Sequence, residues 1–293
     1  MPKLRFTLVP VQRIDRRPSR VAYALPTFFT AGNIFLGFLA IMRAFQGAIA
    51  AKAGYLGSNP DFEAAAKMIG IAVVLDGLDG RIARMTNTVS DFGREMDSLA
   101  DAITFGLAPA VLAFAWGVLS VDTSGNKFWQ EHLFNAGYFA AFMFLLCGTL
   151  RLARFNVQVN PVPKNPGRPD RKYFVGLPIP AGAGMVAAVI YAADSSPIQL
   201  WPFSVAWLAL LTLVGFLMVS TWRYYSFKDL NLLHPRNPLV VIFVCVFLFM
   251  VWSYSQPVLL ALATSYVDSG IVIRIGGILR RTYRRLHPAE ASS

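Results

Sequence analysis

Residues 75–106 read LDGLDGRIARMTNTVSDFGREMDSLADAITFG and carry aspartates at positions 76, 79, 97 and 101. Apolar sequence of helical length lies on both sides, MIGIAVVL at 68–75 and AITFGLAPAVLAFAWGVL at 102–119. A carboxylate within hydrocarbon costs at least about 2.5 kcal/mol, so four of them require a compensating charge. This stretch therefore predicts a functional site within helices that border or enter a membrane.

The spacing of these aspartates predicts their geometry. Asp76 and Asp79 are three residues apart, and Asp97 and Asp101 are four apart. On a helix with 3.6 residues per turn, each pair projects from one face. Two such helices facing each other form an oxygen-rich site that suits hard divalent cations such as Mg²⁺ or Mn²⁺.

The composition indicates an integral membrane protein. Hydrophobic residues make up 55% of the 293 positions and charged residues only 15%, which is unusual for a soluble chain. Apolar segments near the length that crosses about 30 Å of hydrocarbon occur near 25–43, 64–83, 96–119, 134–153, 176–195, 202–222, 238–255 and 257–277. We therefore predict an all-α polytopic membrane helical bundle with about eight transmembrane helices. The predicted organisation is a basic N-terminal segment (1–24), a membrane-embedded domain (25–277) and a basic polar tail (278–293).

The positive charges are distributed unevenly among the predicted connections. The chain has 27 lysines and arginines and a formal net charge of +11. In an eight-helix topology, one membrane face receives only Arg43, Lys52, Lys67 and Lys127. By the positive-inside rule, both termini and the four aspartates lie on the cytoplasmic side. Because the charge follows membrane topology, we expect no nucleic-acid partner.

Small residues and an arginine accompany the aspartates. At helical spacing, Gly80, Ala83 and Arg84 share the face that carries Asp76 and Asp79. Small side chains let a bulky group approach the backbone, and a guanidinium can hold a phosphate through two parallel hydrogen bonds. Two divalent cations would balance four carboxylates, so the site could accept a diphosphate. The residues alone also allow a cation-transport pathway, or structural ion pairs with nearby arginines.

The spacing of the whole acidic stretch resembles the CDP-alcohol phosphotransferase family. The matching pattern is Asp76-x2-Asp79-Gly80-x2-Ala83-Arg84-x8-Gly93-x3-Asp97-x3-Asp101. The resemblance implies that an alcohol displaces CMP from a CDP-linked substrate. It also implies two divalent cations, Mg²⁺ or Mn²⁺, bound by the four aspartates, with Asp101 as the general base. Gly80, Ala83 and Arg84 would contact the CDP group, and Gly93 would permit its close approach.

Other segments resemble one branch of this family, the integral-membrane phosphatidylserine synthases of bacteria and archaea. They include LRLARFNV at 150–157, YFVGLPIPAGAG at 173–184 and MVSTWRYYSFKDL at 218–230. This resemblance implies CDP-diacylglycerol and L-serine as substrates, a homodimer, and an active site facing the cytoplasm from a bacterial inner membrane. The acidic pattern itself does not choose the acceptor, so glycerol 3-phosphate, inositol phosphate and choline stay as alternatives.

Four residues are candidates to contact the serine or the diphosphate: Arg151, Arg154, Asn156 and Arg94. The two arginines of the 150–157 segment could instead be ordinary residues at the membrane edge that extend to the headgroups. Asn33 is a polar residue in the first apolar segment. It is a candidate to reach the diphosphate, or alternatively to bond a neighbouring helix.

Overall fold

The computed structural model describes residues 20–86, 91–123, 125–158, 173–225 and 238–286, and these are mostly helical. The elements are α1 (Arg20–Lys52), α2 (Pro60–Thr86), α3 (Asp91–Asp101), a π-helix η1 (Ala102–Leu107), α4 (Ala108–Gly117), α5 (Lys127–Gln158), β1 (Tyr173–Val175), α6 (Ile179–Ala192), α7 (Trp201–Val219), β2 (Arg223–Tyr225), α8 (Pro238–Ser253) and α9 (Ser255–Leu286). The predicted boundaries at 24/25 and 277/278 fall inside α1 and α9. The division into three parts stays a prediction.

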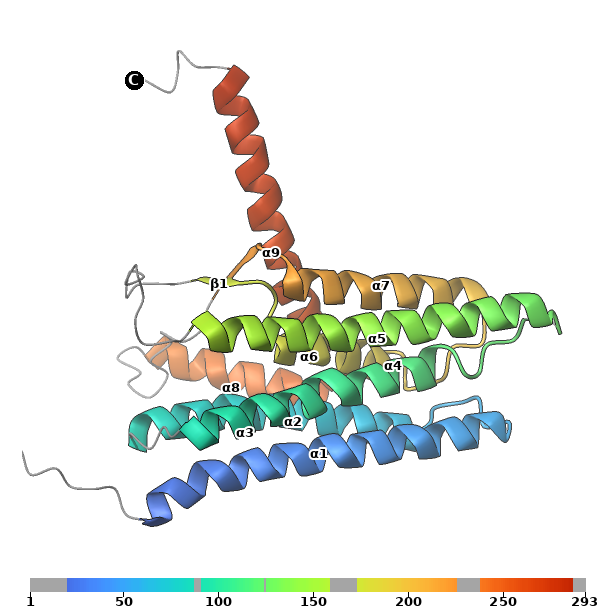
Figure 1. Cartoon of the computed structure of the whole chain (residues 1–293), viewed down its shortest axis with the longest axis horizontal. Helices are drawn as coiled ribbons and strands as arrows, with labels where there is room; N and C mark the ends of the chain where they lie inside the picture. Colours follow the sequence, from blue (N-terminus) through green and yellow to red (C-terminus); the bar gives the residue numbers. More distant parts are fainter. Residues whose placement is uncertain (1–19, 87–90, 124, 159–172, 226–237, 287–293) are drawn as a thin grey trace, which may run out of the picture.

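The helices form an elongated bundle. Figure 1 shows α1 to α8 running along the long axis, whereas α9 runs across it and its C-terminal part projects away. The main pairings are α1 with α2, α5 with α7, α2 with α6, and α6 with α9. One end of the bundle carries the start of α3, the C-terminal ends of α2 and α5, and strand β1 (Figure 1). The four predicted metal-binding aspartates belong to the helices that meet at this end.

Five helices within the described residues are long and apolar enough to cross a membrane. They are Phe28–Lys52, Phe92–Gly117, Lys127–Val157, Trp201–Val219 and Ser255–Gly276. The predicted segments near 176–195 and 238–255 correspond to shorter apolar helices, α6 with 14 residues and α8 with 16. Helix α2 is long but carries several charged residues. The membrane-protein class is thus supported, while eight crossings and the orientation of the termini stay predictions.

The helix that carries Asp97 and Asp101 changes its winding directly after them. Helix α3, η1 and α4 follow one another without a break, and in η1 the amide of Ala108 donates to the carbonyl of Ile103, five residues earlier. Pro109 explains this turn, since it has no amide hydrogen and its ring would clash with the carbonyl of residue 105 in a regular α-helix. Wider π turns of this kind are frequent at functional sites.

The described residues are mostly helical, as predicted, with one short β-pair beside the helices. Strands β1 and β2 form an antiparallel pair in which Phe174 lies opposite Tyr224. Each strand has only three residues, which is too short for an alternating hydrophobic pattern to reveal it in the sequence. The pair lies at the end of the bundle where α5 ends and α9 passes (Figure 1).

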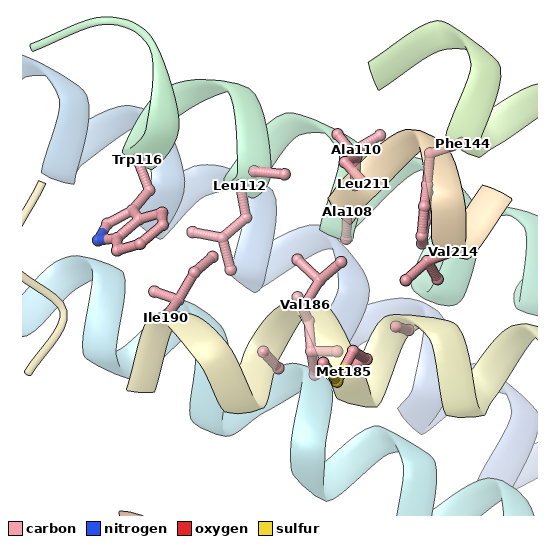
Figure 2. Close-up of a cluster of buried hydrophobic side chains, with 14 of the residues drawn as sticks. Ala108, Ala110, Leu112, Trp116, Phe144, Met185, Val186, Ile190, Leu211 and Val214 are labelled. Atoms are coloured by element: carbon pink, nitrogen blue, oxygen red, sulfur yellow. The ribbon is translucent and has the colours of Figure 1, made fainter. Parts of the chain in front are cut away.

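The core consists of small residues between α1 and α2 and larger ones elsewhere. Ala40, Ala44 and Ala48 recur every four residues on α1 and are buried, so the two backbones approach closely. Figure 2 shows the larger part, in which side chains of α4, α5, α6 and α7 interdigitate around Leu112 and Val186. This packing holds α4, and through it η1 and α3, in place.

The outer surface of the bundle is strongly apolar. Large hydrophobic side chains on α1, α5 and α7 are exposed, among them Phe35, Phe142 and Phe216. A soluble monomer rarely exposes apolar area on this scale. The exposed rings therefore agree with lipid as the surrounding solvent.

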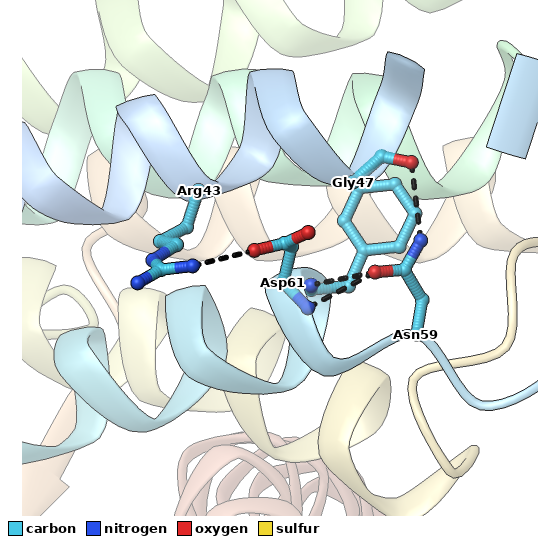
Figure 3. Close-up of polar contacts among 5 residues, drawn as sticks. Arg43, Gly47, Asn59 and Asp61 are labelled. Carbon is cyan, nitrogen blue, oxygen red and sulfur yellow. Dashed lines mark hydrogen bonds and ion pairs between the residues drawn. The ribbon is translucent and has the colours of Figure 1, made fainter. Parts of the chain in front are cut away.

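A buried asparagine fixes the connection between α1 and α2. The Oδ1 of Asn59 accepts hydrogen bonds from the amides of Asp61 and Phe62, and its Nδ2 donates to the carbonyl of Gly47 (Figure 3). Asn59 is the residue before α2, with proline following it, which is a favoured arrangement for a helix start. Asp61 also pairs with Arg43 at 2.7 Å, which joins the two helices at the bundle end opposite the aspartates.

We expect Asn59→Ala to lower the stability by about 1–2 kcal/mol. The substitution removes the cap and the buried hydrogen bond to the Gly47 carbonyl that ties the start of α2 to α1. The measurement is thermal unfolding in detergent, where the variant should have a lower midpoint.

Asn126→Ala is the matched control, because Asn126 caps α5 in the same way through the amides of Phe128 and Trp129 but is exposed. Asn126→Ala should lower the unfolding midpoint clearly less than Asn59→Ala does. Equal losses for the two variants would contradict the role assigned to the buried Asn59 amide.

Candidate functional site

The structure brings three of the four predicted aspartates together. Asp76 on α2 and Asp97 and Asp101 on α3 each place one carboxylate oxygen so that all three atoms lie within 4.8 Å of one another. All three residues are partly buried. The prediction that the two acidic pairs face each other is therefore confirmed for Asp76, Asp97 and Asp101.

The donor set fits a divalent cation. Carboxylates this close repel one another, and a cation between them removes that cost. Oxygen ligands contributed by two helices match the preference of Mg²⁺ and Mn²⁺ for hard donors. The arrangement therefore has the composition and spacing of a metal centre, although the ion type does not follow from it.

The remaining residues of the acidic pattern lie on the same two helices. Asp79, Gly80, Ala83 and Arg84 belong to α2, but their side chains lie outside the described part of the structure. Gly93 and Arg94 belong to the first turns of α3, and Arg94 is exposed. Their predicted contacts with the CDP group and with serine stay predictions.

A hydrogen-bonded chain connects α5 to the acidic helix. The Nδ2 of Asn156 donates to Ser98 Oγ at 2.8 Å, and this hydroxyl donates to the carbonyl of Arg94 at 3.0 Å. Ser98 directly follows Asp97, so the chain holds the helix that carries two of the carboxylates. Asn156, a predicted serine contact, thus lies next to the acidic cluster, and its amide holds α3 through Ser98.

Asn33 is buried against the π-helix. Its side chain is 2% exposed, and its backbone carbonyl accepts a hydrogen bond from Thr104 Oγ1 at 2.9 Å. Among the described residues, no donor reaches its side-chain oxygen Oδ1. A buried polar atom without a partner is costly. This atom can accept a hydrogen bond from a ligand donor or a water molecule; the oxygens of a diphosphate also accept, so a contact with the diphosphate would have to come from the Nδ2 group, and it stays a prediction.

Helix α1 and η1 touch where Gly37 faces Thr104. A Cβ atom built on Gly37 would lie 2.9 Å from Thr104 Cα, which is closer than real Cβ contacts allow. The close approach of the two helices therefore depends on glycine. The contact lies near the acidic cluster in the sequence, because Thr104 follows Asp101 by only three residues.

We expect Gly37→Ala to destabilise the protein by about 1–3 kcal/mol, because the added methyl group must push α1 away from η1. Thermal unfolding in detergent measures this change. Gly32→Ala is the matched control on the same helix, since no atom lies within 4 Å of the added Cβ. The control should be neutral or slightly stabilised through helix propensity, and similar destabilisation in both variants would count against a tight contact.

The two candidate arginines of α5 differ in their surroundings. The guanidinium of Arg151 is partly buried and lies within electrostatic range of the Asp101 carboxylate and of the Tyr266 hydroxyl. Its Nε is buried and donates to no acceptor within the described residues. Arg154, less than one turn further, is exposed. Arg151 is therefore partly buried with a charge interaction to Asp101, whereas Arg154 lies on the surface of the bundle.

Two residues near the cluster were not predicted from the sequence. Ser98 lies between two of the aspartates, and its position next to Asp97 was a usable signal. Thr104 lies in an apolar segment, and its partner is the backbone of α1, 71 residues away.

The geometry agrees with the sequence comparisons. Residues 23–217 match the family model for CDP-alcohol phosphatidyltransferase, a region that includes all four aspartates and Arg151. This region covers more than half of the chain. The chain belongs to the CDP-alcohol phosphatidyltransferase family.

Similar members of the family share one name. A CDP-diacylglycerol–serine O-phosphatidyltransferase of Helicobacter pylori is 33% identical over 255 residues, which is 87% of this chain and 92% of that protein. The enzyme of the same name from Bacillus subtilis is 32% identical over 70% of this chain and 91% of its own length. The one from Methanocaldococcus jannaschii is 35% identical over 55% of this chain and 64% of its own.

Proposed function

We propose that this protein transfers the phosphatidyl group of CDP-diacylglycerol to the hydroxyl of L-serine, giving phosphatidylserine and CMP. This proposal depends on the family match over residues 23–217, and on a relative with the name of that activity that aligns with 87% of the chain. The carboxylate cluster of Asp76, Asp97 and Asp101 supports the metal dependence of the reaction. Family membership argues against a cation transporter.

In this proposal, Asp76, Asp79, Asp97 and Asp101 hold two divalent cations, Mg²⁺ or Mn²⁺. When bound, such ions neutralise charge on the phosphoryl oxygens and on the departing CMP. Asn33, Gly80, Ala83, Arg84 and Gly93 bind the CDP group. Arg151, Arg154, Asn156 and Arg94 are the proposed contacts of serine, and the surroundings of Arg151 support its assignment most strongly.

Asp101 is proposed as the general base. The serine oxygen forms a bond to the lipid-side phosphorus, and its proton passes to the Asp101 carboxylate. The bond between that phosphorus and the bridging oxygen breaks, and CMP leaves with the electron pair. The position of Asp101 within electrostatic range of Arg151 supports this role, since a guanidinium that holds the serine carboxylate brings the hydroxyl near this base.

The membrane arrangement belongs to the same proposal. The five apolar helices support a membrane location, and the distribution of arginine and lysine supports cytoplasmic termini. Eight crossings and a bacterial inner membrane complete the proposal. The active site then faces the cytoplasm, where serine is available. A homodimer is proposed from the family resemblance, and chemical cross-linking in native membranes tests it.

The deciding experiment is CMP release by purified protein in detergent with CDP-diacylglycerol, L-serine and Mg²⁺ or Mn²⁺. We expect release that depends on serine, is abolished by EDTA, and returns when excess Mg²⁺ or Mn²⁺ is added. Parallel reactions with glycerol 3-phosphate, inositol phosphate and choline identify the acceptor. Release with one of these alcohols alone would change the assigned substrate, and no release with any acceptor would contradict the proposed activity.

A further inference from the structure

The continuous run from α3 to α4 buries a side chain at every fourth position. These buried residues are Ala100, Thr104, Ala108, Leu112 and Trp116, each at most 4% exposed, and Figure 2 shows the last three along α4. A regular α-helix turns by about 100° per residue, so each step of four residues would carry this stripe about 40° further out of the core. The π turn of η1 lies inside the stripe and takes up one extra residue, which corresponds to about 100° of rotation. The π turn therefore sets the rotation of α3 relative to α4.

Helix α4 cannot take up a change in this rotation, because α7 holds it. The indole Nε1 of Trp207 donates to the carbonyl of Ala113 at 3.0 Å, and the Oγ of Ser204 donates to the carbonyl of Gly117 at 2.7 Å. A Cβ atom built on Gly117 would overlap the Trp207 ring, so the two helices also pack closely. Any change in the winding of η1 must therefore rotate α3, the helix that carries two of the carboxylates.

Thr104 is the polar member of the stripe, and it fixes the π turn on α1. Its side chain is fully buried, and its Oγ1 donates to the backbone carbonyl of Asn33 at 2.9 Å. Gly37 permits this approach, since an added Cβ would lie 2.9 Å from Thr104 Cα. A threonine within a helix commonly bonds a carbonyl of its own preceding turn, as Thr212 does with Leu208 on α7. Thr104 bonds a different helix, so its hydroxyl joins two elements.

The rotation of α3 decides whether its carboxylates meet that of Asp76. A change of about 100° would carry Asp97 and Asp101 to another face of their helix. Helix α1 packs against η1 and also against α2, which carries Asp76. The bond between Thr104 and α1 thus fixes the π turn relative to the helix that supplies the third carboxylate.

We propose that Thr104 is a positioning residue for the metal-binding carboxylates. Its hydroxyl holds the π turn against α1, and this winding turns Asp97 and Asp101 towards Asp76. Thr104 touches no substrate in this role and acts only through the acidic helix. The inference rests on the metal-binding part of the proposed function and is independent of which alcohol is the acceptor.

The test is Thr104→Val, which keeps the branched shape of the side chain and removes the hydroxyl. The measurement is the Kd for Mn²⁺ of the purified protein without substrate, obtained from the EPR signal of free Mn²⁺. We expect this Kd to rise about tenfold, the lower end of the losses seen when a group that orients metal ligands is removed. Thr104→Ser keeps the hydroxyl and should return the Kd to within about threefold of the wild-type value. A purely structural role would lower the unfolding midpoint and leave the Kd of the folded protein unchanged.

Thr212→Val is the matched control, because it removes a threonine hydroxyl that bonds only within its own helix. Its Kd for Mn²⁺ should stay within about twofold of the wild-type value. Gly37→Ala is a second variant of the same contact, since the added methyl group meets Thr104. It should raise the Kd in the same direction while leaving the Thr104 hydroxyl in place.

The outcomes separate this inference from the proposed reaction. An unchanged Kd for Mn²⁺ in both Thr104→Val and Gly37→Ala would overturn the inference. An equal rise in Thr212→Val, or a Thr104→Ser variant that binds no better than Thr104→Val, would also overturn it. A wild-type protein that binds Mn²⁺ but releases no CMP with any acceptor would overturn the proposed reaction alone, because the comparison of Kd values needs no substrate. A wild-type protein that binds no Mn²⁺ would overturn the metal site and this inference together.

Discussion

Asp101→Asn is expected to reduce the rate of serine-dependent CMP release by about 10²–10⁴-fold, the usual contribution of a positioned general base. Asparagine has nearly the same shape and keeps one oxygen that can face a cation, but it accepts no proton at neutral pH. In the proposed site, Asp76 and Asp97 remain as carboxylate ligands for the cations that would bind the diphosphate. Equilibrium binding of CDP-diacylglycerol should therefore be retained while the kcat falls.

The control is Asp61→Asn, the same substitution at a carboxylate that pairs with Arg43 at the opposite end of the bundle. The rate of serine-dependent CMP release by Asp61→Asn should stay within about twofold of the wild-type rate. The variant should also stay folded, since an exposed ion pair contributes at most about 1 kcal/mol to stability. A rate near the wild-type value in Asp101→Asn would exclude Asp101 as the base. Loss of CDP-diacylglycerol binding would instead assign it mainly to metal retention.

Arg151→Lys is expected to raise the KM for L-serine by about ten- to a hundredfold. Lysine keeps the charge but lacks the planar pair of donors that matches a carboxylate, and its shorter reach changes the contact beside Asp101. The KM for CDP-diacylglycerol should change much less. Initial rates of CMP release over a range of each substrate give both values.

Two further arginines make this test specific. Arg154→Lys should have a clearly smaller effect on the serine KM, because Arg154 is exposed whereas Arg151 is partly buried beside the acidic cluster. Arg43→Lys, at the far end of the bundle, controls for the general effect of exchanging arginine. A larger effect of Arg154→Lys than of Arg151→Lys would reverse the assignment of the serine carboxylate to Arg151.

Most of the helices could be predicted from the sequence, because long apolar segments are recognisable without knowledge of their neighbours. The predicted segment at 96–119 corresponds to the continuous run of α3, η1 and α4. The π turn within it was not predicted, although Pro109 was visible, because several local adjustments can accommodate a proline inside a helix. The three-residue strands were missed because their pairing joins segments about 50 positions apart.

The candidate site was predictable to the extent that it is built within single helices. The spacing of Asp97 and Asp101 determines that they share a face, since this relation follows from helix geometry alone. The same argument predicted two facing acidic pairs, and the carboxylates of Asp76, Asp97 and Asp101 do converge.

The sequence by itself determined the membrane class, the acidic pattern and the family. Only the tertiary structure decided that Arg151 is partly buried whereas Arg154 is exposed, and that Asn156 holds α3 through Ser98. The physical reason is that helical periodicity relates residues within one helix. Which face meets which neighbour depends on the packing of side chains from segments far apart in the chain, such as Gly270 against Tyr224.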